Sequence, residues 1–235
     1  TFKWVGMLHE TLIEQRVENV IKIMSDDCLV IHLSTQERTD KAIDRNIEIL
    51  ERQIREEDRK DPRPIIYLAK SYFDKARYDP DEKQKKIYFD LAYMLFEEYL
   101  NGTGSLGEEG YKEGSGWGEE RATAWAYISE IAKISNKFNV AIKALHNAII
   151  EDPTMPIYYV DMALTYCLKG DFAKAQHWLT LATSVPEPQT TIVHSPRDLK
   201  TKALEVDFAI ALNKLDMERA QRDAEMLLKL LPGNE

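Results

Sequence analysis

From Thr35 onward, the apolar positions of the chain recur at spacings of three and four residues, the period of an α-helix with one buried face. The first such segment covers residues 41–57 and puts four apolar side chains on one face: Ile43, Ile47, Leu50 and Ile54. It runs into a balanced mixture of acidic and basic side chains, which is typical of a solvated helix end. The pattern therefore predicts a helical protein from about residue 36.

A pattern of small and aromatic residues repeats in the second half of the chain with a period of 34 residues. Trp125 matches Tyr159 at this spacing, and Ala141 matches Ala175. A third copy follows 45 residues later, because the proline-containing stretch 185–196 lengthens the connection. Each copy holds two helical segments, so the sequence predicts a series of helical hairpins.

This unit resembles the tetratricopeptide repeat (TPR), a helix–turn–helix of 34 residues that stacks on its neighbours. Small side chains at Ala163, Ala175 and Ala182 would let the helices of a unit approach closely. Gly170 suits the tight turn between two helices. Together with a looser copy that comes before these, the resemblance implies a mostly α fold. We expect a TPR-like α-solenoid of four helical hairpins and one leading helix over residues 36–235.

Residues 1–35 have a different character. Two runs rich in β-branched side chains, Val20–Met24 and Cys28–Leu33, flank the turn-forming residues 25–27. These runs predict a two-stranded β-ribbon, which would be marginal in isolation and should pack on other structure. We therefore predict a division into a β-ribbon region, residues 1–35, and the helical domain.

A glycine-rich insertion, residues 101–118, interrupts the helical pattern. It contains the spacing GxGxxG at Gly102, Gly104 and Gly107. That motif binds dinucleotides when it follows a strand and opens a helix, and here it follows a helix, so we interpret the segment as an exposed connection. Tyr111 and Trp117 are candidate partner-binding residues within it, unless they dock back on the repeats.

Composition removes several classes of protein. The net charge of −9 argues against a nucleic-acid-binding protein, and no apolar run approaches the ~18 residues of a membrane span. The two cysteines, Cys28 and Cys167, lack CxxC or Cys/His zinc spacing, which favours a reducing, cytoplasmic location. Thr1 in place of an initiator Met suggests a piece of a longer protein.

No local pattern of Ser/His/Asp or Cys/His suggests a nucleophilic site, so we expect a binding surface. TPR domains that grip a carboxylate terminus need Lys, Asn and Arg at set positions of successive first helices. The corresponding positions hold Thr123, Ala126 and Glu130, then Ile157, Val160 and Leu164, so this clamp is absent. Ile157, Val160 and Leu164 make one first helix unusually apolar. They are either covered by the rest of the protein, which we favour, or reserved for an apolar partner.

The N-terminal segment compresses Trp4, Gly6, His9 and Glu10 into seven residues. This W-x-G-x-x-H-E is similar to the end of the catalytic domain in bacterial and phage family-2 glycosyltransferases that carry C-terminal TPR repeats. Weaker matches follow in the same order along the chain: Ile31-His32, Asp44-Arg45-Asn46, Ile49-Leu50, Tyr67-Leu68-Ala69, Tyr72, Trp117 and Glu119-Glu120-Arg121.

The resemblance implies a parent enzyme with a GT-A type α/β catalytic domain, of which residues 1–35 would be the remnant. In that family a DxD carboxylate pair holds Mg²⁺ or Mn²⁺ against the nucleotide sugar. His9 and Glu10 would lie at the edge of the active site, and Trp4 would contact substrate. No DxD follows a strand here and no metal site is complete, so we expect no sugar transfer and no cofactor in this chain alone. The repeats would position a protein or glycan acceptor.

Two alternatives from other classes account for the helical domain equally well. One is a free-standing TPR adaptor that assembles proteins, and the other is a structural component of a phage or cell envelope. Neither explains the motif from Trp4 to Glu10.

Overall fold

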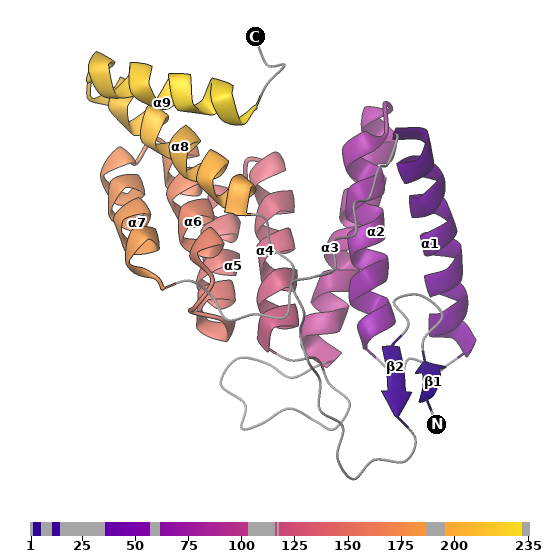
Figure 1. The fold of residues 1–235 in the computed structure, drawn as a ribbon. Coiled ribbons are helices and arrows are strands. Elements are labelled where there is room, and N and C mark those ends of the chain that lie inside the picture. Colours follow the sequence, from indigo (N-terminus) through magenta and orange to yellow (C-terminus); the bar gives the residue numbers. More distant parts are fainter. Residues whose placement is uncertain are drawn as a thin grey trace. The chain divides into compact units, whose positions relative to one another are not determined.

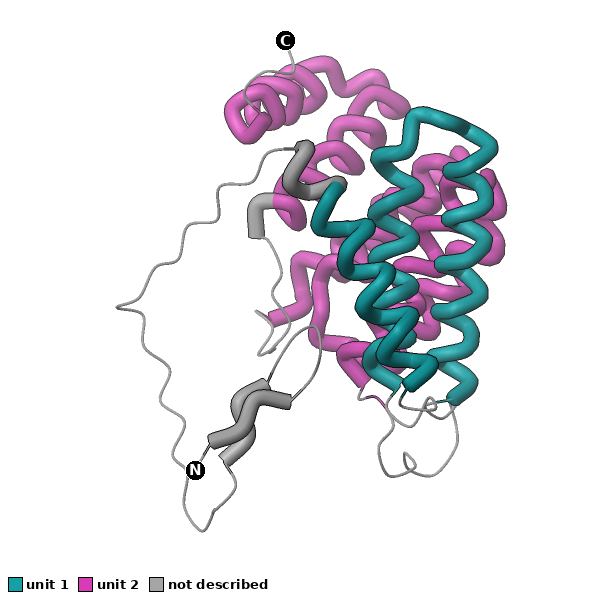
Figure 2. Tube along the Cα trace, turned by 90° about the vertical axis from the view of Figure 1, so that its right-hand side faces the viewer, with its two compact units in different colours: residues 1–102 teal, residues 103–235 magenta. Residues whose placement is uncertain are grey.

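The computed structural model describes residues 2–5, 11–14, 36–56, 62–102, 116, 118–186 and 196–231. The chain divides into two compact units, residues 1–102 and residues 103–235, coloured separately in Figure 2.

The first unit contains two short strands, β1 (Phe2–Val5) and β2 (Thr11–Glu14). They pair antiparallel, with Trp4 opposite Leu12. These strands precede the runs in which the sequence predicts a ribbon. Val20–Met24 and Cys28–Leu33 both fall outside the described residues.

Three helices follow in the first unit: α1 (Gln36–Glu56), α2 (Arg63–Tyr78) and α3 (Glu82–Gly102). Helix α2 packs against both α1 and α3 and lies between them in Figure 1. Its first turn contains Pro64, whose missing N–H is not needed at that position of a helix. The predicted leading helix corresponds to α1, and the looser first hairpin corresponds to α2 and α3. The charged residues 77–86, which separate the two apolar segments of this hairpin in the sequence, lie mostly inside these two helices.

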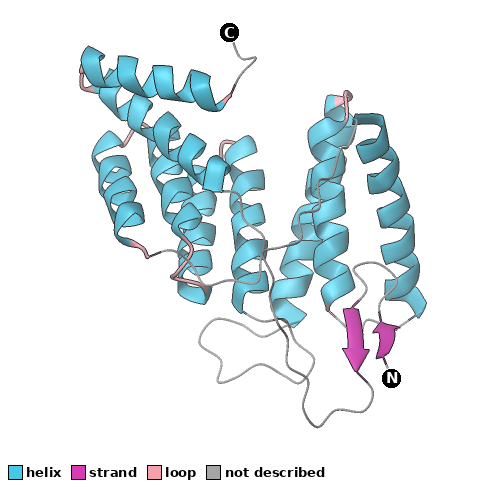
Figure 3. Cartoon of the chain, viewed as in Figure 1, coloured by secondary structure: helices cyan, strands magenta, loops and turns pink. Residues whose placement is uncertain are grey.

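The second unit consists, in its described part, of three helical hairpins (Figures 1 and 3). The first pairs α4 (Gly118–Ile134) with α5 (Phe138–Glu151), and the second pairs α6 (Pro156–Leu168) with α7 (Phe172–Ser184). The third pairs α8 (Pro196–Asn213) with α9 (Met217–Leu230). Successive hairpins contact one another through α5 with α6, and through α8 with both α6 and α7. The predicted repeat register is confirmed.

All three hairpins turn in the same way. Each turn has one residue with positive φ: Asn136 at 55°, Gly170 at 83° and Leu215 at 58°. In each, the amide of the next residue donates to a carbonyl five positions back, on Ala132, Tyr166 and Ala211 respectively, which satisfies a helix-terminal carbonyl. Asp171 and Asp216 then cap the following helix, each accepting a hydrogen bond from the amide three residues on. The predicted role of Gly170 is confirmed.

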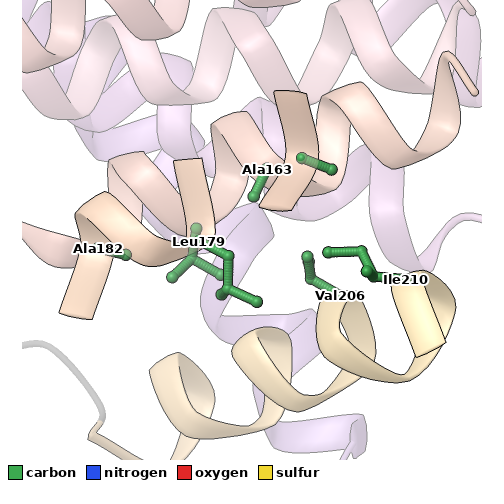
Figure 4. Packing of buried hydrophobic residues seen from close by; sticks show 7 residues of the cluster. Ala163, Leu179, Ala182, Val206 and Ile210 are labelled. Carbon is green, nitrogen blue, oxygen red and sulfur yellow. The ribbon is translucent and has the colours of Figure 1, made fainter. Parts of the chain in front are cut away.

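The core of the second unit lies where the hairpins meet. Ala163, Leu179, Ala182, Val206 and Ile210 pack together from α6, α7 and α8 (Figure 4). A second cluster joins α4, α5 and α6 and consists of Ala122, Ala148, Met155 and Tyr158. The small residues in these clusters let the helices approach closely, as the spacing of these residues in the sequence predicts.

Candidate functional site

The main candidate site is a groove in the first unit, formed where α1 and α3 flank α2. Its volume is about 910 Å³, which is within the range of ligand sites in proteins. Each helix contributes one face, at spacings of three, four or seven residues. The lining residues are Glu51, Ile54 and Arg55 on α1; Ile65, Leu68 and Tyr72 on α2; and Leu91, Met94, Leu95, Glu97, Glu98 and Asn101 on α3.

The floor and one wall of this groove are aliphatic. Ile65 and Leu68 of α2 are buried at the floor. Leu91 and Leu95 of α3 are half-buried along the wall, and Met94 is 64% exposed. A methionine is a flexible and polarisable contact residue, which suits a surface that adapts to a partner. The groove can therefore bury apolar side chains of another molecule.

A polar and aromatic cluster fixes the three helices at one end of the groove. The Tyr72 hydroxyl of α2 donates a 2.6 Å hydrogen bond to Glu51 of α1, and its ring stacks on Tyr88 of α3 at 6.0 Å between centroids. Lys75 of α2 binds Asp44 of α1 at 2.7 Å and lies 4.9 Å above the Tyr88 ring. Burial and the Glu51 carboxylate raise the pKa of Tyr72, so its hydroxyl stays a donor at neutral pH. The groove is thus held open by contacts that do not use its apolar floor.

Acidic side chains dominate the rim of the groove. Of the described residues that line it, three are acidic, Glu51, Glu97 and Glu98, and one is basic, Arg55. Tyr93 hydrogen-bonds to Glu97, and burial followed by this bond raises the pKa of Tyr93. Glu97 and Glu98 lie near the carboxyl end of α3, whose last turn has no basic residue.

The first helices of the second unit carry a different feature, a network of four charged residues from α4, α6 and α8. Lys202 binds Asp161 at 2.8 Å and Glu130 at 3.5 Å, while Lys133 binds Glu130 at 2.7 Å and Asp161 at 3.7 Å. Burial alone would raise the pKa of Glu130, but the two ammonium groups outweigh it and hold the pKa below its usual value. The charges balance within the network, so it is a structural connection.

An aromatic cluster lies on α5, α6 and α7. His146 and His177 both contact the Trp178 ring edge to face, at 5.5 and 6.2 Å between centroids, and Tyr159 lies 6.1 Å from it. Both histidines are exposed. Among the residues that the structure describes, no group of three or more His, Cys, Asp or Glu side chains could hold a metal ion.

The apolar residues predicted on α6 separate in the structure. Val160 is 2% exposed and belongs to the cluster shared with α7 and α8, so its side chain is covered by the next hairpin. Ile157 and Leu164 are half-buried and pack at the edges of the two clusters. Cys167 also packs at the edge of the core, and burial raises its pKa to about 11. The packing of the repeats accounts for the apolar character of α6.

The structure describes only one of the remaining predicted site residues. His9, Glu10, Tyr111 and Trp117 lie outside the described residues, and Trp4 is in β1. The groove itself was missed by sequence reasoning. One signal could have indicated it, since Leu91, Met94 and Leu95 share a helix face with Glu98.

The class of fold follows from these observations: the helical part of the chain is a repeat array of TPR-like helical hairpins. The structure is similar to the crystal structure of MamA, with a TM-score of 0.54 at 16% identity, over 85% of this chain and 96% of that one. A lower TM-score of 0.44, at 15% identity, relates it to TTC0263, a thermophilic TPR protein from Thermus thermophilus, over 85% of this chain and 88% of that one. No known protein family and no curated protein matches the sequence. No helix in the described part of the chain is long and apolar enough to cross a membrane.

Proposed function

We propose that the chain is a protein-interaction module that binds a partner in the groove of α1, α2 and α3. The observation that carries the proposal is the groove, about 910 Å³ in volume, with an aliphatic floor and an exposed methionine on its wall. Concave sites with a mainly apolar lining and a few polar side chains are the usual form of binding sites in proteins. The TPR-like fold supports the same function, because arrays of helical hairpins present extended binding surfaces.

A peptide-display selection on the immobilised chain tests this function. We expect selected peptides to share apolar residues and to bind the wild-type chain in solution. The variant Met94→Glu places a charge on the groove wall and should weaken binding at least tenfold, as burial of an unpaired charge requires. Ile87→Glu is the matched control, because Ile87 is also an exposed apolar residue of α3, at 49%, and does not line the groove.

The proposal fails if the selection yields no binding peptide. It fails equally if Met94→Glu binds the selected peptides as tightly as the wild-type chain and the control Ile87→Glu do. Both variants replace exposed side chains, so a change in folding would show as a loss of helical circular dichroism and be recognised separately.

The resemblance to family-2 glycosyltransferases supports a second, more specific proposal, in which this module belongs to such an enzyme and recruits its protein or glycan acceptor. Its support is the sequence motif from Trp4 to Glu10. The nucleotide sugar and its Mg²⁺ or Mn²⁺ would bind the parent enzyme and not this chain. We expect residues 1–235 with either metal to release no nucleotide diphosphate from a nucleotide sugar, and release above the metal-only blank would contradict this assignment.

A further inference from the structure

We infer that the third hairpin of the second unit presents a docking face for one further amphipathic helix, supplied by another protein. This outer face consists of Phe208 and Leu212 on α8 and of Met217, Ala224 and Leu227 on α9. Its positions correspond to positions of the second hairpin that form one cluster with α8. The inference goes beyond the proposed function, because it concerns the second unit and does not involve the α1–α3 groove.

The repeat register relates the second and third hairpins residue by residue. Gly170 and Leu215 occupy the same place in their turns, since both have positive φ and both precede the aspartate that caps the next helix. With these two residues aligned, Ala163 corresponds to Phe208, Cys167 to Leu212, Phe172 to Met217, Leu179 to Ala224 and Ala182 to Leu227. The five residues of the second hairpin all belong to the cluster that includes Val206 and Ile210 of α8, or pack against it (Figure 4).

The outer face is more exposed than its counterpart on the second hairpin. Leu212 is 40% exposed and Met217 is 63% exposed, whereas the corresponding Cys167 and Phe172 are half-buried. The other three residues of the face are half-buried, and their counterparts are buried. Ala220 of α9 stays buried, so the exposure does not extend to the whole hairpin. A repeat with no neighbour on one side normally presents polar side chains there, and the apolar outer face departs from this rule.

The array itself shows which kind of structure covers such a face. On the second hairpin the covering element is helix α8, which contributes four residues to the cluster: Leu199, Ala203, Val206 and Ile210. Their spacings of four, three and four residues form a stripe along one side of the helix, roughly 16 Å long at 1.5 Å per residue. Between the first and second hairpins, α6 contributes Tyr158 to a cluster with α4 and α5. A helix makes both of these interfaces, which favours a helix over an extended peptide on the outer face.

One residue beside the outer face is charged. Glu205 of α8 is exposed, and it corresponds to Val160 of α6, which is 2% exposed. A helix with the apolar stripe of α8 would meet this carboxylate in place of an apolar side chain, and removing a carboxylate from water without a partner is unfavourable. Glu205 therefore lowers the affinity of such a helix, and replacing it should raise the affinity.

A designed helical peptide tests the inference on the full chain of residues 1–235. This stripe peptide keeps Leu199, Ala203, Val206 and Ile210 at their spacing in α8 and has glutamine, lysine and glutamate elsewhere. The control peptide has the same composition, with the four apolar residues distributed around the helix. We expect fluorescence anisotropy to show at least tenfold tighter binding of the stripe peptide, because only its apolar residues share one face.

Met217→Glu should weaken binding of the stripe peptide about tenfold, because it puts a charge where the peptide covers the outer face. Met217 is the first residue of α9, and a glutamate in the first turn of a helix is favourable, so this variant should fold. Ile150→Glu is the matched control, since Ile150 of α5 is also exposed, at 66%, and belongs to neither cluster. It should bind the stripe peptide as the wild-type chain does.

Glu205→Val should have the opposite effect. It introduces the residue that the second hairpin has at this position and should tighten binding of the stripe peptide about three- to tenfold. A misfolded variant would not gain affinity, so this measurement decides the question even if Met217→Glu proves unstable.

Equal binding of the two peptides to the wild-type chain would overturn the inference. So would equal binding by Met217→Glu and Ile150→Glu, or an unchanged affinity in Glu205→Val. Analytical ultracentrifugation of the wild-type chain tests the other occupant: a dimer that Met217→Glu dissociates would assign the outer face to a second copy and overturn the docking of another protein, whereas a monomer supports it. The proposed function is tested separately, by the display selection and Met94→Glu.

Discussion

Leu215 has the backbone conformation that glycine has in the preceding hairpin, and replacing it with glycine should stabilise the protein. Its φ is 58°, in the left-handed region, where the Cβ of an ordinary residue meets the following carbonyl oxygen. Its side chain is 82% exposed, so truncation removes little packing. At the equivalent turn, Gly170 adopts φ of 83° at no such cost.

The magnitude follows from two opposing effects. Relief of the left-handed conformation contributes about 1–2 kcal/mol. The greater freedom of glycine in the unfolded chain offsets about 0.4–1 kcal/mol of this. The free energy of unfolding of Leu215→Gly should therefore rise by roughly 0.5–1 kcal/mol, or about 1–4 °C in the midpoint temperature for a chain of this length.

Thermal and urea unfolding followed by circular dichroism at the helix band measures this change. Leu215→Ala is the control that separates conformation from exposure, because alanine removes the exposed side chain and keeps the left-handed cost. Gly170→Ala should lose about 1 kcal/mol in the free energy of unfolding, for the converse reason. An added Cβ at Gly170 meets no atom within 4 Å, so this loss comes from the backbone conformation and not from a clash. A gain for Leu215→Ala equal to that of Leu215→Gly would refute the reasoning.

Three further predictions concern buried or partly buried polar groups. Arg121→Met should destabilise the second unit by about 3–5 kcal/mol in urea unfolding, because it breaks a buried ion pair, 2.8 Å long, with Glu151, whose side chain is 7% exposed. A loss below about 1 kcal/mol would contradict this. Burial, and then the neighbouring Asp207, raise the pKa of Asp223 above its ordinary value of 3.8, so ionisation of Asp223 destabilises the folded protein as pH rises. Asp223→Asn should therefore raise the free energy of unfolding by roughly 0.5 kcal/mol at pH 7 and leave it unchanged below pH 3.8. A gain that persists in acid would assign the effect to packing instead. Burial raises the pKa of Cys167 to about 11, so little of its thiol is ionised at pH 8. In a variant whose other cysteine is replaced by serine, Cys167 should react with iodoacetamide at pH 8 at least tenfold more slowly than free cysteine. A rate equal to that of free cysteine would show that the thiol is solvated.

The helical hairpins could be predicted because their signals are local. The spacing of small residues fixes which faces meet, and Gly170 marks one turn directly. The matching turn at Leu215 could not be recognised from residue type, since leucine rarely adopts positive φ. The repeat register does place a turn near Leu215, because the third hairpin continues the pattern of the first two after its longer connection.

The groove could not be predicted in the same way. Its residues come from three helices, and the pattern of Leu91 and Leu95 is the same whether another helix covers that face or leaves it open. Only the tertiary arrangement decides this. The apolar face of α6 shows the converse case, since Val160 has the same character and is covered by α8.

The charged network of the second unit has a consequence for how this unit unfolds. In a one-dimensional array, each hairpin contacts its neighbours alone, so terminal hairpins can fray independently. Lys202 of the third hairpin reaches past α6 to Glu130 of the first at 3.5 Å. Loss of α8 would thus remove a partner from two other hairpins at once. Detachment of the last hairpin should weaken the first, and hydrogen exchange should show α4 and α8 opening together.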